Sequence, residues 1–171
     1  WDWGHTLQRK WSKSNVRIND RMIFLSIHWP SLITDSVSIP ISKDDVALYY
    51  AGFCKSFLWT ILHYEVETLF KRKEWEAYKR INQRFAEAIV DIYEPGDLIL
   101  IQDYYFMLLP LLLRQKLPSA QISFFLHAPF PTSELFRVLV VREELLKGLL
   151  GADLIGFQVC VILFLSKVLQ S

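Results

Sequence analysis

Short apolar runs alternate with amphipathic stretches over residues 97–158. Alternation of this kind is typical of βαβ units, in which helices connect parallel strands. It predicts an α/β fold with a mainly parallel sheet and helices on both faces. The elements that we expect, in chain order, are strand 97–102, helix 105–116, strand 121–126, helix 133–149 and strand 153–156.

The first half of the chain has longer helical patterns. Apolar and aromatic residues recur every three or four positions over 75–93, which predicts an amphipathic helix that Glu94-Pro95-Gly96 ends. Ser42, followed three residues later by Asp45, has the spacing of a capping box and predicts a helix from there to about residue 70. We further expect strands at 22–28 and 36–41, and we leave residues 1–20 unassigned.

Polar side chains follow two of the predicted strands at the point where each strand ends. Asp103 follows the run Leu98–Ile101 closely, and His127 follows Leu126 and opens a turn that contains two prolines. Ligands of open α/β sheets bind outside the carboxyl ends of the strands, so we expect both side chains to face one ligand if the strands are neighbours. The alternatives are a helix-capping role for Asp103 and a purely structural role for His127.

Composition narrows the class of protein. The 171 residues suffice for about one domain, and 52% apolar with 22% charged residues is typical of globular proteins. A formal net charge of +1 gives no reason to expect nucleic acid or a membrane surface as a partner. The chain has only two cysteines, without metal-ligand spacing, and no signal segment at its start. Both observations favour the reducing environment of the cytosol over secretion. We expect a cytoplasmic domain that binds no metal and no cofactor.

Four stretches form a long, ordered set of motifs: YYAGFCKSFLWTILHY at Tyr49–Tyr64, then Asp103-Tyr104, FFLHAPFPTSELFR at Phe124–Arg137, and Arg142–Phe157. This set resembles the trehalose-6-phosphate synthase family of retaining GT-B glucosyltransferases, and the resemblance extends over about residues 22–165. It implies that 21–171 is an incomplete, Rossmann-like N-terminal domain on the acceptor side, the N-terminal half of a GT-B architecture. The family's nucleotide-binding second domain has no counterpart here.

The resemblance also assigns roles to four residues. His127 matches the histidine that acts on the donor sugar and is the catalytic candidate. Asp103 matches the aspartate that binds hydroxyl groups of glucose-6-phosphate. Tyr50 and Trp59 match the tyrosine and tryptophan that line the pocket for the acceptor phosphate. Taken without the resemblance, these two residues are ordinary core aromatics.

Several polar positions depart from the family pattern. Gln102 and Tyr105 stand where the family has two histidines, and Ala51, Cys54 and Lys55 replace an asparagine, a serine and a second asparagine. The scaffold motifs are better kept than the polar ones. This is the pattern expected of the noncatalytic regulatory subunits of fungal trehalose synthase complexes, and equally of the synthase-like region of related phosphatase subunits.

Two interpretations of function remain. The first is a synthase-like regulatory or structural subunit, partnered by catalytic trehalose-6-phosphate synthase or trehalose-phosphate phosphatase subunits, with a residual affinity for glucose-6-phosphate. The second is a fragment of an active synthase that transfers glucose from UDP-glucose to glucose-6-phosphate. We expect the chain by itself to be inactive, because a GT-B site is closed by two domains.

Overall fold

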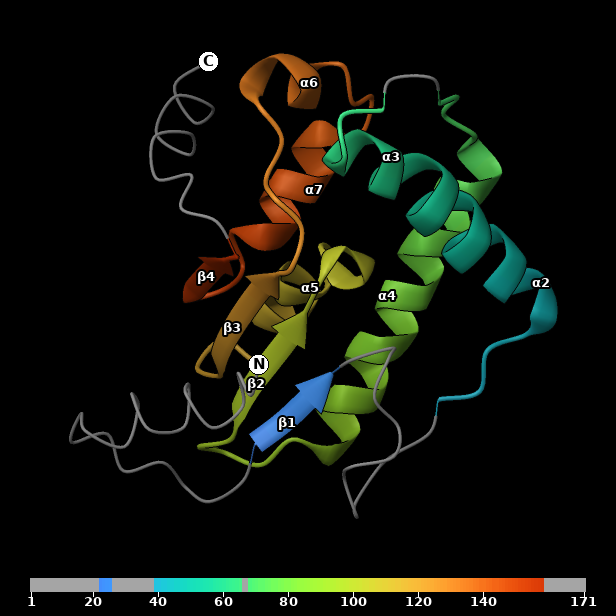
Figure 1. The fold of residues 1–171 in the computed structure, drawn as a ribbon. Coiled ribbons are helices and arrows are strands. Elements are labelled where there is room, and N and C mark those ends of the chain that lie inside the picture. The colour runs from blue at the N-terminus through green and yellow to red at the C-terminus, as the bar shows by residue number, and fades with distance from the viewer. Residues whose placement is uncertain (1–21, 26–38, 66–67, 159–171) are drawn as a thin grey trace.

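The computed structural model describes residues 22–25, 39–65 and 68–158 (Figure 1). Its four described strands form one parallel sheet in the order β1-β2-β3-β4. They are β1 (Met22–Leu25), β2 (Leu98–Gln102), β3 (Gln121–Leu126) and β4 (Leu154–Phe157). The predicted α/β fold and the parallel pairing are confirmed, and residues 26–28 of the first expected strand lie outside the described residues.

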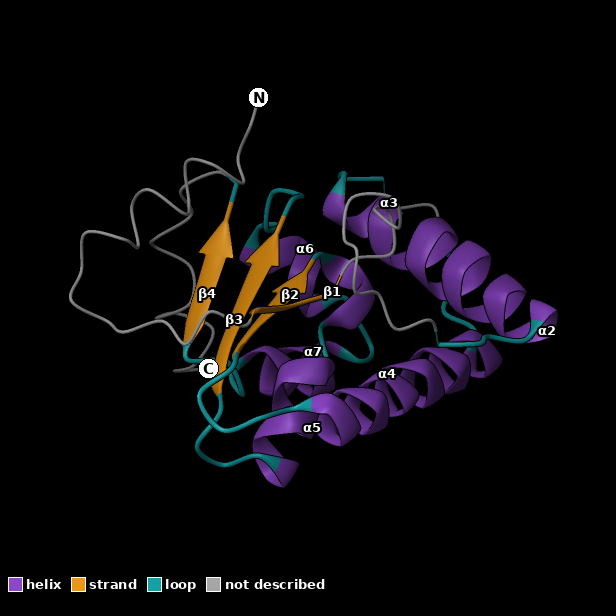
Figure 2. Ribbon diagram, turned by 90° about the horizontal axis from the view of Figure 1, so that it is seen from below, coloured by secondary structure: helices purple, strands orange, loops and turns teal. Residues whose placement is uncertain are grey.

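Three helices connect the strands on one side of the sheet. They are α4 (Arg72–Ile92), α5 (Leu109–Lys116) and α7 (Arg142–Leu149), and Figure 2 shows them on the same side of the strands. Crossover connections are almost always right-handed, so strands added in one direction place all their helices on one face. A layer on the other face requires the strand order to reverse. No reversal occurs in β1–β4, and the described connecting helices accordingly form one layer on this face (Figure 2).

The core lies between the central strands and these helices. Ile99 and Ile101 of β2 and Ile122 of β3 are fully buried, and so are Tyr78 and Ile81 of α4. In β2 the buried Ile99 and Ile101 alternate with the half-buried Leu98 and Leu100, because successive side chains of a strand point to opposite faces of the sheet. The predicted amphipathic helix over 75–93 is confirmed as α4, and Gly96 with φ 101° follows in the turn that ends it.

A long helical segment begins at Ser42, whose hydroxyl accepts a hydrogen bond of 3.1 Å from the backbone N–H of Asp45. It comprises α2 (Lys43–Val46), the π-helical segment η1 (Ala47–Leu58) and α3 (Trp59–Leu62). The predicted extension to residue 70 is wrong. Tyr64 adopts φ 66°, and the N–H groups of Tyr64 and Glu65 bond back to the carbonyls of Ile61 and Thr60. This helix end normally uses glycine, so a tyrosine there gives no stop signal in the sequence.

Two predicted helices are interrupted. The segment 105–116 begins as the short 3-10 helix η2 (Tyr104–Phe106), and α5 starts afresh at Leu109 with Pro110 in its first turn. The segment 133–149 divides into α6 (Ser133–Arg137) and α7. Between them Leu139 and Val141 are 1% and 3% exposed, whereas Val138 and Val140 are 64% and 67% exposed. The chain between the two helices forms tight turns, in which the N–H of Leu139 bonds back to the carbonyl of Phe136 and the N–H of Arg142 to that of Leu139.

The strand predicted at 36–41 is not found in its described part. Residues 39–41 have no regular secondary structure, and residues 36–38 lie outside the described residues. In the part of the chain that the structure describes, no helix combines the length and the apolar composition needed to cross a membrane.

Candidate functional site

The carboxyl ends of β2 and β3 place the two polar candidates on neighbouring strands. Gln102 is paired with Phe125 in the sheet register, and the backbone N–H of Asp103 donates to the carbonyl of Phe125 over 2.7 Å. His127 follows Leu126, the last residue of β3. The predicted neighbourhood of these strands is confirmed. That both side chains contact one ligand remains a prediction.

Asp103 has an unusual backbone conformation. Its φ of 70° and ψ of 169° lie in a region that residues other than glycine rarely adopt. Its carboxylate Oδ1 accepts a 3.0 Å hydrogen bond from the N–H of Tyr104 and so caps η2. The capping role that we considered from the sequence is therefore present. Strain at such a position is typical of functional sites, so capping does not exclude a ligand-binding role.

Gln102 holds the imidazole of His127. The His127 Nε2 lies 2.7 Å from the Gln102 Oε1, and because a carboxamide oxygen only accepts, Nε2 carries the donated hydrogen. The Phe125 ring packs edge-on against the same imidazole with its centroid at 4.9 Å. From the sequence alone, Gln102 was only the residue that replaces a histidine of the family pattern. The contact was not predicted because it depends on the register of β2 against β3.

Tyr50 and Trp59 come from the long helical segment and reach the turn that follows Asp103. The Tyr50 ring stacks on Tyr105 with a centroid distance of 5.8 Å and an interplanar angle of 14°. The centroid of the Trp59 ring lies 5.7 Å from that of the Tyr104 ring. The structure thus brings the two predicted phosphate-pocket aromatics and Asp103 to one place, with His127 joined to it through Gln102.

A buried network of hydroxyl groups fixes this turn. The Tyr78 hydroxyl donates to the carbonyl of Tyr104 over 2.8 Å and accepts from the N–H of Met107 over 2.9 Å. The Tyr49 hydroxyl donates to the carbonyl of Tyr105 over 3.1 Å. The sequence placed Tyr78 on the apolar face of its helix and gave it no polar role. Asn82, one helical turn later on the same buried face, was the available signal, and its amide also donates to the carbonyl of Tyr105.

Burial governs the electrostatics of the phenols. The Tyr104 hydroxyl donates to the Tyr105 hydroxyl over 2.9 Å, and both side chains are buried. Loss of hydration raises the pKa of Tyr104 and of Tyr105 well above the ordinary value for tyrosine. Burial likewise raises the pKa of the Cys54 thiol. These groups stay protonated and uncharged at neutral pH.

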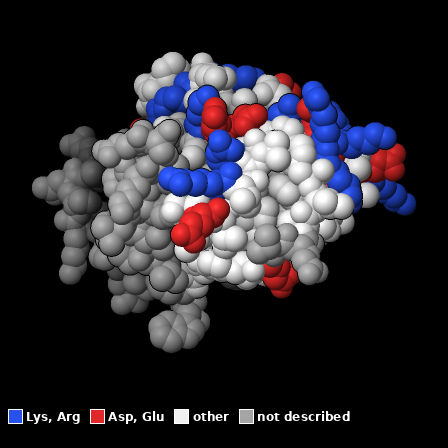
Figure 3. All heavy atoms as spheres, turned by 90° about the horizontal axis from the view of Figure 1, so that it is seen from above, with Lys and Arg blue, Asp and Glu red and all other residues white. Residues whose placement is uncertain are grey.

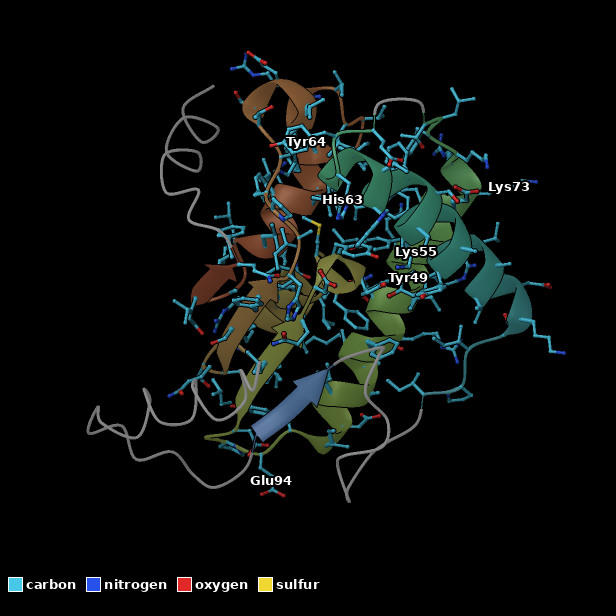
Figure 4. All side chains as sticks on the ribbon, viewed as in Figure 1. Tyr49, Lys55, His63, Tyr64, Lys73 and Glu94 are labelled. Carbon is cyan, nitrogen blue, oxygen red and sulfur yellow. The ribbon has the colours of Figure 1, made fainter. Side chains whose placement is uncertain are left out.

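The site also contains two side chains to which the sequence assigned no chemistry. These are Lys55 and His63, which Figure 4 labels. Lys55 lies over the rings of Tyr50 and Trp59, and His63 stacks on Trp59. Among residues 22–25, 39–65 and 68–158, no three His, Cys, Asp or Glu side chains are grouped so as to hold a metal ion.

Comparison with known proteins gives a consistent result. The sequence profile of glycosyltransferase family 20 matches residues 9–166. A trehalose synthase complex regulatory subunit of Saccharomyces cerevisiae is 44% identical over 131 residues, which are 72% of this chain and 12% of that protein. An alpha,alpha-trehalose-phosphate synthase of Dictyostelium discoideum is 54% identical over 112 residues, 64% of this chain and 14% of that protein.

Solved structures extend the similarity to the fold. The N-terminal domain of a Candida albicans trehalose-6-phosphate phosphatase is 46% identical, with a TM-score of 0.62 over 64% of this chain and 24% of that one. A Burkholderia vietnamiensis alpha,alpha-trehalose-phosphate synthase is 34% identical, with a TM-score of 0.67 over 70% of this chain and 27% of that one. The chain spans only about an eighth to a quarter of the length of these proteins.

Proposed function

Because this chain belongs to glycosyltransferase family 20, we propose that it is part of a noncatalytic, synthase-like subunit of a trehalose-6-phosphate synthase and phosphatase complex. Residues 21–171 would form part of the acceptor-side domain of a longer cytosolic protein whose nucleotide-binding domain lies elsewhere. The subunit would support trehalose-6-phosphate formation by catalytic partners. The similarity to a regulatory subunit of the yeast complex supports this proposal.

The replacement of two histidines by Gln102 and Tyr105 carries the proposal. An imidazole exchanges protons near neutral pH, whereas a carboxamide does not titrate at all. Tyr105 is bonded to Tyr104 and stacked on Tyr50, and its burial raises its pKa. Two positions beside Asp103 have therefore lost their capacity for proton transfer at neutral pH. His127 is kept, but its Nε2 is engaged by Gln102.

The retained residues support binding without turnover. Tyr50, Trp59 and Asp103 still converge on one turn, so we expect a weak affinity for glucose-6-phosphate. A ligand shifts only the states that bind it differently, and such binding would let the subunit sense the substrate level of the complex.

An active synthase is the second candidate. The identity of 54% to a Dictyostelium synthase favours it, together with the retention of His127, Asp103, Tyr50 and Trp59. In this case the nucleotide-binding domain of the longer protein would complete the site and transfer glucose from UDP-glucose to glucose-6-phosphate.

Affinity purification of the tagged full-length protein from the cytosol of its own cells separates the two candidates. We expect it to co-purify with a catalytic trehalose-6-phosphate synthase or a trehalose-phosphate phosphatase, identified by mass spectrometry and by activity. An unrelated tagged protein of similar abundance serves as the control. Recovery of the protein alone, with full synthase activity, would reject the subunit in favour of the enzyme.

A further inference from the structure

The π-helical segment aligns side chains that an α-helix would separate. Tyr50 and Lys55 are five residues apart, and in a π-helix the backbone hydrogen bonds join residues i and i+5, so these two side chains leave the helix on nearly the same side. Trp59 and His63 continue the row at intervals of four. The four residues Tyr50, Lys55, Trp59 and His63 therefore form one line along the helical segment, which we call the basic-aromatic row.

Lys55 supplies the charge of this row. Its Nζ lies 4.7 Å from the ring centroid of Trp59 and 5.7 Å from that of Tyr50, distances at which an ammonium group is attracted to an aromatic face. Some of the other lysines pair with carboxylates, as Lys71 does with Glu74 and Lys79 with Glu76. Within the described part of the chain, no carboxylate lies at ion-pairing distance from Lys55.

His63 and Trp59 give the row a fixed geometry. The His63 Nδ1 lies 2.8 Å from the carbonyl of Trp59, so it donates the hydrogen bond and orients the imidazole, with Nε2 as its second polar atom. The two rings stack at a centroid distance of 3.6 Å. Trp59 is 37% exposed and presents an accessible apolar surface beside Lys55. Figure 4 shows Lys55 and His63 on the flank of the helix nearer the strands, whereas Lys73 lies at the outer end of α4.

We propose that Lys55, with Trp59 and His63, is the specificity-determining group that selects a phosphorylated monosaccharide over a neutral one. This inference rests on the retained pocket of the proposed function and names its charge-recognising residue. A lysine ammonium binds phosphate as a compact point charge, and the Trp59 surface suits the C–H groups of a sugar ring. The ring of Tyr104 packs against Trp59, and the backbone N–H of Tyr104 donates a hydrogen bond to the carboxylate of Asp103. This carboxylate can also accept hydrogen bonds from sugar hydroxyls.

Calorimetric titration tests the proposal with glucose-6-phosphate and glucose as separate ligands. Lys55→Gln should weaken glucose-6-phosphate binding by about tenfold or more, since hydrogen bonds to charged groups contribute about 1.5–3 kcal/mol. The same variant should leave the weaker glucose binding within about twofold. Lys55→Arg, which keeps the charge, should retain most of the preference for the phosphorylated sugar.

Lys73→Gln is the matched control, because it removes the same charge from an exposed position on a different helix. It should leave both affinities unchanged, and thermal melting checks that each variant is folded. Equal binding of glucose-6-phosphate by wild type and Lys55→Gln would overturn the inference and leave the proposed subunit intact. The inference would also be overturned if a folded Lys55→Gln protein lost affinity for both sugars equally. The same holds if the wild-type protein bound neither sugar. Release of UDP from UDP-glucose, by contrast, would refute the proposed function and not the role of Lys55.

Discussion

The backbone strain at Asp103 distinguishes a helix-capping role from a ligand-binding role. As a helix cap, an aspartate needs only an ordinary extended conformation before the helix. At φ 70° and ψ 169°, Asp103 instead occupies a region with a cost of about 1–3 kcal/mol for any residue but glycine. Such a residue persists only where the surrounding structure fixes it, and positions of this kind cluster at active and ligand-binding sites. The sequence could place Asp103 at a strand end, but the strain depends on the turn that the buried tyrosines hold and has no local signal.

This strain predicts the order of two variants. Asp103→Ala and Asp103→Gly both remove the carboxylate and its bond to Tyr104. Glycine adopts the positive φ without strain, so we expect Asp103→Gly to be more stable than Asp103→Ala by about 1–2 kcal/mol, even though glycine loses more entropy on folding. Urea unfolding of the two variants measures the difference. Greater stability of the alanine variant would show that the conformation is not strained.

At the scale of elements, the contacts between helices explain the interrupted segments. Periodicity predicted α4 correctly because its whole buried face lies within one continuous helix. Pro110 gave a local signal for the break before α5, because proline is not tolerated inside a helix but fits its first turn. Periodicity did not predict the break between α6 and α7, which depends on packing between elements distant in the sequence. Gly148 of α7 is one such contact: a Cβ there would lie 2.3 Å from the backbone carbonyl oxygen of Met107 and 2.8 Å from the Cα of Leu108. Helix α7 can pack this closely against the turn that follows η2 only because residue 148 is a glycine.

Gly148→Ala should therefore destabilise the domain by about 1–3 kcal/mol, the usual range for overpacking, despite the better helix propensity of alanine. Gly52→Ala is the matched control, since the three atoms nearest to a Cβ at residue 52 all belong to the side chain of Glu74, which is flexible, and none belongs to the backbone. Thermal unfolding of both variants should show a clearly lower midpoint for Gly148→Ala. Equal midpoints would mean that α7 is not held against the Met107 carbonyl as closely as the structure has it.

At the scale of the whole molecule, the order of strands and helices was predictable, because alternating apolar runs allow few α/β topologies. The candidate site was predictable only in part. Asp103 and His127 follow from the rule that strand ends carry the chemistry, whereas Tyr50 and Trp59 came from the family resemblance alone. The contacts of Gln102, Lys55 and Tyr105 required three-dimensional register and a π-helix that no sequence pattern indicated.

The face at the carboxyl ends of the strands carries charges of both signs (Figure 3). Figure 3 looks down on the end of the molecule toward which the strands point, and in its described part lysines and arginines are interspersed with acidic residues around a wide uncharged area. The whole chain carries a formal net charge of +1. A nucleic-acid-binding surface would instead show a continuous basic patch.

The release of UDP by the purified full-length protein, incubated with UDP-glucose and glucose-6-phosphate, tests the central claim most directly. Because Gln102 and Tyr105 replace two histidines and cannot transfer protons at neutral pH, we predict no release above the buffer background. The 171-residue chain alone should be equally inactive. UDP release that His127→Ala abolishes would contradict the account and identify the protein as an active synthase.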